Sequence, residues 1–332
     1  MKIFATLYDN RYNKLYDISE AILDLTISTK IEDDPGKATF KLIKRDDIAF
    51  WEGATVSITV DNINMFKGFV FKKKRGKDVD IIDVICYNQL RYLKNKDSAI
   101  FENMTSDEIF SNLCERFAPR VKYRVVDKSS HKCTPRNNVA CAIYEMIQEA
   151  LRDTLINSGK WFIIRDNFGV LEHVDIMSRR SGLILGDGSG VEDLLYETSI
   201  DKDTYNQIKL YRENKDTSKR EIFIVNDTVN SGDTLNYWGV LQLYEKVDED
   251  LNLAQIEHRA MGMLKLYNNT KRSLRLQCRG FPSIEAGSII QCSIKDLGDL
   301  SMNSDLLITS CTHNIANEDH TMTLDMEVVT NV

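Results

Sequence analysis

Residues 199–228 read SIDKDTYNQIKLYRENKDTSKREIFIVNDT, and residues 237–250 read YWGVLQLYEKVDED. Polar and apolar residues alternate from Asn206 to Arg212, and this period of two is typical of a half-buried strand. The polar, charged segment from Asn214 to Lys219 is interpreted as a hairpin tip. Apolar residues resume between Glu221 and Val225, so the pattern predicts a strand hairpin in this part of the chain.

A third strand and a helix are expected after the hairpin. Trp238 to Tyr244 is another apolar segment, and the acidic run 248–250 precedes a helical pattern, where negative charge favours the positive end of the helix dipole. The helix is expected at about 251–268, with an apolar face made by Ile256, Ala260, Met263, Leu264 and Tyr267. The charged residues and tyrosines of this stretch are expected on a solvated face or at turns, so none of them indicates catalysis.

The motifs of this stretch resemble a known protein family. The order SID-x-x-TYN-x-IKLY-x-E, KRE and WGVLQLYEKVDED is similar to that of baseplate hub proteins of contractile phage tails and R-type bacteriocins. These are the XkdQ-like proteins of PBSX-type prophages, within the late control D or tail hub family. The resemblance continues in VICYNQLRYLKNKD (84–97), SGKWFIIRDNFGVL (158–171) and HTMTLDMEV (320–328). It is weakest in residues 1–60 and around His131.

The resemblance implies a structural protein with no enzymatic activity and no cofactor. Two tube-like β-barrel domains per chain and a homotrimer are expected, so that six similar barrels form a ring between a six-fold tail tube and a three-fold spike. A closed ring requires two different faces of each chain to meet. The implied partners are the tail tube protein, the spike protein, baseplate wedge proteins and a LysM-containing hub neighbour. The implied location is the baseplate of a phage tail or tail-like particle that assembles in the bacterial cytoplasm.

The composition is that of a soluble globular chain with two or three domains. The 332 residues are 42% hydrophobic, and a net charge of −7 with a pI near 5.4 argues against general binding to a nucleic-acid backbone. We expect no sequence-specific nucleic-acid contact. The sequence has no secretory signal and no apolar run long enough to cross a bilayer, so no membrane insertion is expected. Seven cysteines without a repeated spacing indicate reduced thiols.

Residues 1–98 are expected to form the first β-barrel. Segments with β-branched or aromatic residues in rough alternation are separated by turn signals; they are KIFATLYD, NKLYDIS, ILDLTISTKI, KATFKLI, ATVSITV, NMFKGFVFKK and DVDIIDVICY. Such a series without a helix predicts a barrel or a sandwich. The most basic run of the chain lies here, either as an assembly interface or as a solvated hairpin end; its charged residues are Lys72, Lys73, Lys74, Arg75 and Lys77.

Helical periodicity from Phe101 onward predicts an α+β domain at 99–196. Thr105 and Glu108 form a capping-box signature before the first helix of this domain. A strand hairpin is expected at 161–174, where two apolar segments surround the turn sequence DNFG.

A second helix of this domain is expected from Val139 to Leu155. Asn137 or Asn138 is the expected cap, and Gly159 is the expected terminator. The glycine-rich segment 186–190 has the composition of a phosphate-binding loop, but such a loop requires a preceding strand and a long following helix. Only about one and a half turns of helix are expected after it, so the segment is interpreted as a connector.

Residues 197–332 are expected to form a second β-barrel that carries the helix at about 251–268. Its other strand-like segments are SLRLQCRG (273–280), SIIQCSIK (288–295), LLITSCTHNI (306–315) and TMTLDMEVV (321–329). The fold class is therefore predicted as α+β, mostly β, with two tube-like β-barrel domains flanking a small mixed α/β domain. The two β-rich domains also suggest a structural repeat, although no repeat is visible in the letters.

His131, Cys133 and Cys141 are residue types that could form a metal or thiol site. A closed zinc site requires four ligands, and the sequence has no second ligand pair at suitable spacing. A cysteine nucleophile requires a histidine base that a third group orients, which this spacing does not establish. We therefore predict a solvent-exposed loop and no metal. Other cysteines lie in strand-like segments and are expected to be buried hydrophobes: Cys86, Cys278, Cys292 and Cys311.

Two alternative functions remain open on the sequence alone. A tail-associated peptidoglycan hydrolase would require two convergent carboxylates, or a thiol–histidine pair, in a cleft. A carbohydrate-binding β-barrel module would require an exposed aromatic platform. Trp51, Trp161 and Trp238 lie in different segments, and packing in a core explains each of them more simply.

Overall fold

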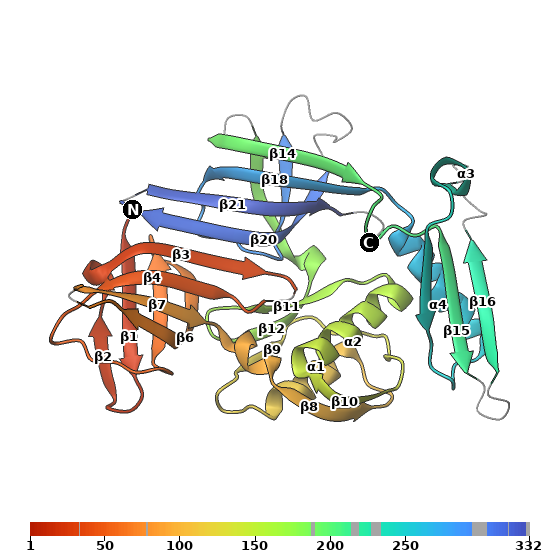
Figure 1. Cartoon of the computed structure of the whole chain (residues 1–332), viewed down its shortest axis with the longest axis horizontal. Helices are drawn as coiled ribbons and strands as arrows, with labels where there is room; N and C mark the ends of the chain where they lie inside the picture. Colours follow the sequence, from red (N-terminus) through yellow and green to blue (C-terminus); the bar gives the residue numbers. More distant parts are fainter. Residues whose placement is uncertain are drawn as a thin grey trace.

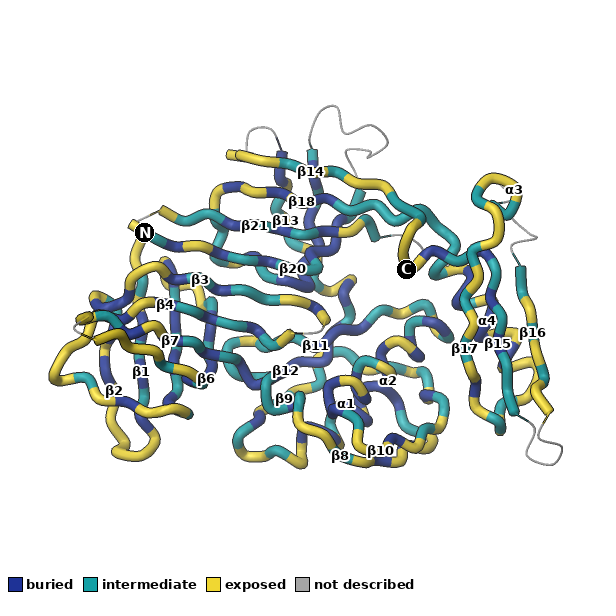
Figure 2. The backbone as a smooth tube through the Cα atoms, viewed as in Figure 1, coloured by how far each residue is buried: buried dark blue, intermediate teal, exposed yellow. Residues whose placement is uncertain are grey.

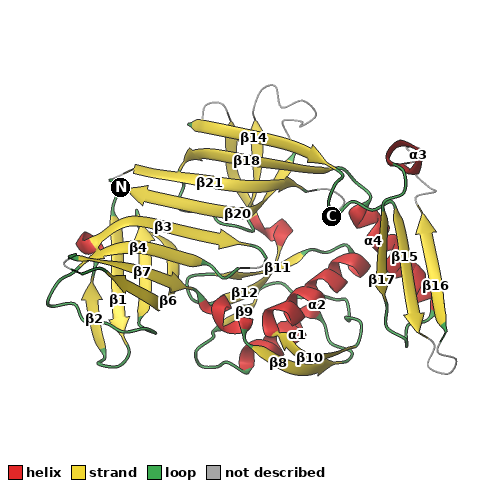
Figure 3. Ribbon diagram, viewed as in Figure 1, coloured by secondary structure: helices red, strands yellow, loops and turns green. Residues whose placement is uncertain are grey.

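The structure is a computed structural model that describes residues 1–32, 34–77, 79–186, 190–213, 219–226, 234–293, 304–317 and 319–329. The chain is mostly β, as predicted (Figure 3). A broad sheet occupies one side of the molecule, helices α1 and α2 lie below it, and α4 with three strands forms a lobe at the far end (Figure 1).

The N-terminal strands are β1 (Ile3–Asp9), β2 (Lys14–Asp17), β3 (Ile22–Lys30), β4 (Lys37–Ile43), β5 (Thr55–Val60), β6 (Ile63–Arg75) and β7 (Ile81–Tyr87). All seven predicted segments are therefore confirmed as strands. The central strands are β8 (Lys96–Phe101), β9 (Tyr123–Val125), β10 (Arg136–Ala142), β11 (Phe162–Asp166) and β12 (Leu171–Asp175).

The C-terminal half adds β13 (Arg180–Gly186), β14 (Val191–Ser199), β15 (Gln207–Glu213), β16 (Arg220–Asn226), β17 (Gln242–Lys246), β18 (Lys271–Arg279), β19 (Ile289–Ser293), β20 (Asp305–Ala316) and β21 (Asp319–Val328). The α-helices of the described residues are α1 (Ser106–Glu115), α2 (Ile143–Ser158), α3 (Thr234–Trp238) and α4 (Leu253–Tyr267). Short 3-10 helices lie at Ser19–Ala21, Gln89–Lys94 and Ile176–Arg179. Within this part of the chain, no helix combines the length and the apolar character needed to cross a membrane.

One sheet joins the N-terminal and C-terminal strands. Its order is β14-β18-β21-β20-β3-β4-β7-β6-β5-β1-β2, with β19 beside β20 and β13 beside β19. The junction is an antiparallel pairing of β20 with β3, in which Ser310 lies opposite Lys30 and Asn314 opposite Thr26. Hydrogen bonding among the described strands does not close either part into a barrel, so the two-barrel architecture stays a prediction.

The strands repeat one pairing pattern in the two parts of this sheet. β3 pairs with β4, β4 with β7, β7 with β6 and β6 with β5. In the same order, β14 pairs with β18, β18 with β21, β21 with β20 and β20 with β19. The long strand of each set is bulged, between Val70 and Lys72 in β6 and between Ile308 and Ser310 in β20. The suggested structural repeat is therefore confirmed at the level of strand pairing.

Alternation explains why these strands form and which face they bury. In β5 the side chains of Val56, Ile58 and Val60 are fully buried, while the threonines and serine between them are half-exposed. Such strands bury one face in a core and leave the other face polar. Buried and less buried residues accordingly alternate along the strands in both parts of the sheet (Figure 2).

The central α+β region follows the prediction except at one helix. The capping box of Thr105 and Glu108 is confirmed at the start of α1, and the β11–β12 hairpin is confirmed as well. The predicted start of the second helix at Val139 was wrong. Arg136–Ala142 is strand β10, which pairs with β8, and α2 begins only at Ile143. Gly159 ends α2 in the left-handed conformation, as predicted.

The stretch 199–250 contains the predicted hairpin, but it forms a sheet of its own. β15 pairs antiparallel with β16 and parallel with β17, and α4 packs against one face of this sheet. Of the predicted hairpin tip at 214–219, residues 214–218 lie outside the described part of the chain. Because the large sheet does not include these strands, its C-terminal part consists of β13, β14 and β18 to β21. The expected membership of 207–246 in the second barrel therefore differs from the observed strand pairing.

The division into 1–98, 99–196 and 197–332 stays a prediction. One observation refines it: β14, at Val191–Ser199, pairs along its whole length with β18. The prediction of a short helix after the glycine-rich segment is therefore wrong, because residues 191–199 form an extended strand. Of that glycine-rich segment, residues 187–189 lie outside the described part of the chain.

Candidate assembly surface

The unburied face of the large sheet is polar and spans eight consecutive strands, from β14 to β6. Residues that lie opposite each other on adjacent strands share a face, so this face can be traced from strand to strand. Its centre consists of small hydroxyl and amide side chains, none of them buried: Thr26, Ser28, Thr39, Ser273, Ser310, Thr312, Asn314, Thr321 and Thr323. Across the β20–β3 junction, the hydroxyl of Thr26 donates to the side-chain oxygen of Asn314 at 3.1 Å.

Opposite charges gather at the two ends of this polar face. Acidic residues predominate on β14 and β21 and are balanced in part by Lys271, Arg275 and Arg279 of β18; the acids are Asp193, Glu197, Asp325 and Glu327. Lysines predominate on β3, β4 and β6; they are Lys30, Lys37, Lys41, Lys72 and Lys74. The opposing charges are Asp83 of β7 and the ion-pair partners of Lys41 and Lys30, which are Asp24 and Asp34. The face therefore has an acidic end at β14, with Asp193 and Glu197, and a basic end at β6, with Lys72 and Lys74.

The basic run predicted as an interface divides between the two faces of β6. Lys72 and Lys74 lie opposite Ile85 and Asp83 of β7, and they project from the polar face. Lys73 points the other way: its ammonium donates to the carbonyl of Phe50 at 2.6 Å and lies 5.3 Å from the ring centre of Trp51.

Arg75 follows Lys73 on that second side of β6, and Lys77 follows the end of the strand. An interface role for the whole run stays a prediction. Trp51, expected in a core, is 41% exposed. Its ring lies beneath the guanidinium of Arg11, whose carbon is 5.0 Å from the ring centre.

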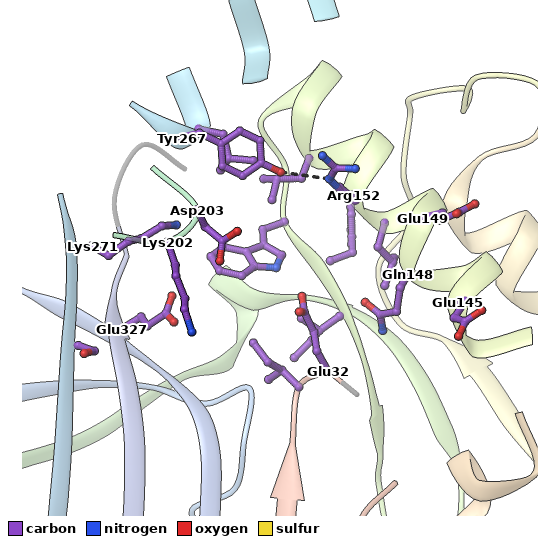
Figure 4. A pocket seen from close by; sticks show the side chains of 18 of the residues that line it. Glu32, Glu145, Gln148, Glu149, Arg152, Lys202, Asp203, Tyr267, Lys271 and Glu327 are labelled. Carbon is purple, nitrogen blue, oxygen red and sulfur yellow. Dashed lines mark hydrogen bonds between the residues drawn. The ribbon is translucent and has the colours of Figure 1, made fainter. Parts of the chain in front are cut away.

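A groove of about 940 Å³ lies beside the acidic end of the polar face (Figure 4). It is bounded by β14, β18 and β21 on one side and by α2 and the end of α4 on the other. Arg152 of α2 donates to the hydroxyl of Tyr267 at 3.1 Å at this boundary. Glu197 and Glu327 belong both to the groove and to the polar face, so the two form one continuous surface.

A buried ionic cluster connects α2 to α4. The carboxylate of Asp153 is fully buried and accepts from the guanidinium of Arg259 at 2.6 Å, while Arg259 also lies 3.3 Å from Glu245 of β17. Burial alone would raise the pKa of Asp153. Hydrogen bonds from His131 and the Thr134 amide, together with the charge of Arg259, reverse this effect and hold the pKa below its usual range.

This cluster corrects the prediction of a solvent-exposed loop at His131. The ring of His131 lies 3.1 Å from Asp153, and the thiol of Cys133 is buried against the Ala150 carbonyl at 3.6 Å. Asp153 was missed on the sequence, although an acid beside the apolar stripe of a helix was a usable signal. The described residues contain no group of three or more His, Cys, Asp or Glu side chains placed to hold a metal ion.

Ser106 and His173 form one of two buried pairs that have the composition of a nucleophile and its base. The Ser106 hydroxyl lies 3.1 Å from Nε2 of His173, and Nδ1 donates to the Asp127 carbonyl at 2.8 Å. Both side chains are fully buried, and burial lowers the pKa of His173. No reacting atom of this pair reaches solvent, which fits a structural role. The hydrogen bond between the two side chains connects the start of α1 to β12.

The second pair is Cys311 with His313, next to His320. The thiol lies 3.2 Å from Nε2 of His313, which donates to the Ile284 carbonyl at 2.8 Å, and Nδ1 is 2.9 Å from the ring of His320. Burial raises the pKa of the thiol and lowers the pKa of His313 to about 4. An activated thiolate requires the opposite shifts, so this pair fits a structural core.

His313 predicts a loss of stability in acid. In the unfolded chain the imidazole takes up its proton near its ordinary pKa of 6.5, whereas the folded chain resists protonation until about pH 4. The unfolded state therefore binds more protons in this window, and stability falls by about 3 kcal/mol as the pH drops through it. Urea unfolding of wild type and His313→Gln from pH 7 to 4 measures this. The two profiles should converge in acid; parallel profiles for wild type and His313→Gln would contradict the assignment.

Comparison with known proteins identifies the family. The sequence model described as YQBQ-like matches residues 25–327. The chain belongs to the YQBQ-like family. It is 26% identical over 278 residues to the phage-like element PBSX protein XkdQ of Bacillus subtilis, covering 83% of this chain and 81% of that protein. The predicted relationship to XkdQ-like proteins is confirmed.

Solved structures share the fold of this YQBQ-like chain. The 43 kDa tail protein of prophage MuSo2 from Shewanella oneidensis superposes with a TM-score of 0.70 at 14% identity, covering 99% of this chain and 98% of that one. An E. coli component of the type VI secretion system, described as similar to T4 tail proteins gp27 and gp5, has a TM-score of 0.57 at 12% identity, covering 93% of this chain and 74% of that one. At such identities the likeness concerns the fold alone.

Proposed function

We propose that this chain is a structural hub subunit of a phage tail or tail-like particle. Three copies form a ring around the tail axis, and the polar face of the large sheet lines the passage through that ring. The single observation that carries the proposal is the continuous face of eight strands, which lies opposite the two main cores of the sheet and is built from two repeats of one strand pattern. Each repeat serves as one of the six similar units of the ring.

The physical character of the face agrees with this role. A sheet face made of Thr, Ser and Asn side chains stays hydrated and offers few apolar contacts, which suits a passage that other molecules cross. The two edge strands of the face carry opposite charge, acidic on β14 and basic on β6, which favours a head-to-tail contact between copies.

The partners follow from the same placement. A ring with six similar units on one side and three identical chains on the other can join a six-fold tail tube to a three-fold spike. The names of XkdQ and of the tail-protein structures support a place in such a particle. Wedge proteins and a LysM-containing neighbour are proposed at the outer surface. The particle is proposed to be contractile, which includes particles of the bacteriocin type. The chain acts there without catalysis, and the burial of both nucleophile-like pairs supports this.

The mass of the assembly tests this function. Sedimentation of the purified chain across concentrations, with and without the spike protein of the same particle, should show a species of three times 38.1 kDa. Electron microscopy of that species should show a ring with a central opening. A monomer of 38.1 kDa under both conditions would remove the hub role.

A further inference from the structure

The repeat inside the chain contains a template for the contact between chains. In each repeat one residue is bulged out of the long strand, after Val70 in β6 and after Ile308 in β20. The first paired residues after the bulges are Lys72 in β6 and Ser310 in β20, so these two positions are equivalent.

The equivalence can be followed across both repeats of the sheet by strand register. In the first repeat, position 72 of β6 lies opposite position 85 of β7, position 85 lies opposite position 39 of β4, and position 39 lies opposite position 26 of β3. Lys72 is therefore in register with Thr26. In the second repeat, Ser310 of β20 is in register with Leu195 of β14 through position 325 of β21 and position 275 of β18. Thr26 of β3 therefore corresponds to Leu195 of β14, and two further steps along each strand relate Ser28 to Glu197 and Lys30 to Ser199.

Within one chain, β20 of one repeat pairs antiparallel with β3 of the other. Thr312 lies opposite Ser28, and Ser310 lies opposite Lys30. The equivalent strands at the outer ends of the face are β6 and β14. Among the described residues, β14 pairs with β18 only, and β6 continues to Arg75, beyond Phe69, which is the last residue that it pairs with β5.

We propose that β6 of one copy pairs antiparallel with β14 of the next copy, with Lys74 opposite Glu197. The same register places Lys72 opposite Ser199 and Gly76 opposite Leu195. The partner is thus a second copy of this chain, and the proposal rests on the proposed ring. The β20–β3 junction inside each chain and the β6–β14 junction between chains then alternate around the ring.

The side chains at these positions suit the register. Lys74 and Glu197 carry opposite charge on the same polar face, and within the described residues neither has an ion-pair partner. Lys72 lies diagonal to Glu197, still within reach of a long side chain. Leu195 is 61% exposed on an edge strand, and opposite it Gly76 has no side chain to obstruct contact. A shift by one residue would turn every side chain to the other face.

Charge reversal tests the proposed contact. Lys74→Glu and Glu197→Lys each place like charges opposite one another, so each should weaken trimer formation by about fivefold at every contact of the ring. The double variant Lys74→Glu with Glu197→Lys should restore trimer formation toward wild type. The control Lys122→Glu alters an exposed lysine away from both edges and should leave trimer formation unchanged.

Cysteine pairs test the register itself. Opposite residues have Cβ atoms about 5 Å apart and diagonal ones about 7 Å, so only the former approach disulfide geometry. Under mild oxidation, Lys74→Cys with Glu197→Cys should give linked dimers and trimers on a non-reducing gel, well above Lys72→Cys with Glu197→Cys. Wild type, in which six of the seven thiols are buried, gives the background.

The outcomes separate this proposal from the ring itself. If wild type is trimeric while the charge variants also form full trimers, or the diagonal cysteines link as well as the opposite ones, the register is wrong and the hub role stands. A charge-swapped double variant no better than the single variants would also overturn the register. If wild type stays monomeric with and without the spike, both proposals fail. Circular dichroism of each variant confirms that the fold is intact.

Discussion

Replacing Asp153 by Asn is expected to lower the free energy of unfolding by up to about 3–5 kcal/mol, because the substitution removes the closer and fully buried counter-charge of Arg259. Asn keeps the shape and one acceptor oxygen for His131 and Thr134 but removes the charge that faces Arg259. Both charged side chains are shielded from solvent, at 0% and 6% exposure. Glu245 of β17, whose carboxylate lies 3.3 Å from the guanidinium of Arg259, then remains as the carboxylate partner of Arg259 at the joint between α2 and α4.

Urea unfolding of wild type and Asp153→Asn at pH 7 measures the effect. Glu149→Gln is the matched control on the same helix, since its partner Arg136 is 2.6 Å away but the carboxylate is 48% exposed. Exposed pairs contribute at most about 1 kcal/mol, so the control should change little. A cost for Asp153→Asn no larger than that of the control would show that the joint does not depend on this charge pair.

The same residue gives the comparison a pH dependence of known sign. The pKa of Asp153 is lowered in the folded chain from an ordinary value of 3.8, so its contribution is complete above that value and is lost as the pH falls below it. The difference between wild type and Asp153→Asn should therefore be constant from pH 7 to about 5 and shrink in stronger acid. His313 alters both proteins equally in that window and cancels from the difference.

Local patterns predicted most of the elements, because the spacing of apolar residues over a few neighbouring positions reflects the period of a strand or a helix. The segment TVSITV alternates in sequence as it alternates in burial. The error at Val139 has a physical reason: it stands four residues before Ile143 and completes an apparent helical face. Pairing of β10 with β8 prevailed, and Ala140 adopts a positive φ of 53° there, which a helix does not allow. Val139 is 68% exposed.

Long-range pairing could not be read from the sequence. The β20–β3 junction joins Asn314 to Thr26, and the ion pair joins Asp153 to Arg259, across separations that leave no local pattern. The assembly surface shows the same limit. The basic run at 72–77 was found by composition, but only the strand register separates Lys72 and Lys74 on the polar face from Lys73 beneath it.

The joint between α2 and α4 also depends on shape, and Gly262 is its closest point. A Cβ atom at this position would lie 2.1 Å from the Ile156 carbonyl oxygen and 3.1 Å from the carbonyl carbon. These are backbone atoms in the last turn of α2, so no side-chain rotation can relieve the overlap. One turn earlier on α4, His258 lies 3.1 Å from the Asn157 carbonyl, so α4 crosses the C-terminal end of α2 directly.

Gly262→Ala is therefore expected to destabilise the chain by at least about 2 kcal/mol, the range of strained core substitutions. Helix propensity acts in the opposite direction, because Ala in a helix interior is favoured over Gly by about 1 kcal/mol. The sign of the change thus decides between close helix packing and a loosely attached lobe. Gly182→Ala, where a Cβ meets nothing within 4 Å, is the matched control in the same unfolding experiment. A Gly262→Ala variant as stable as wild type would mean that α4 moves away from α2 at little cost, and that the ion pair of Asp153 and Arg259 holds the lobe without close helix contact.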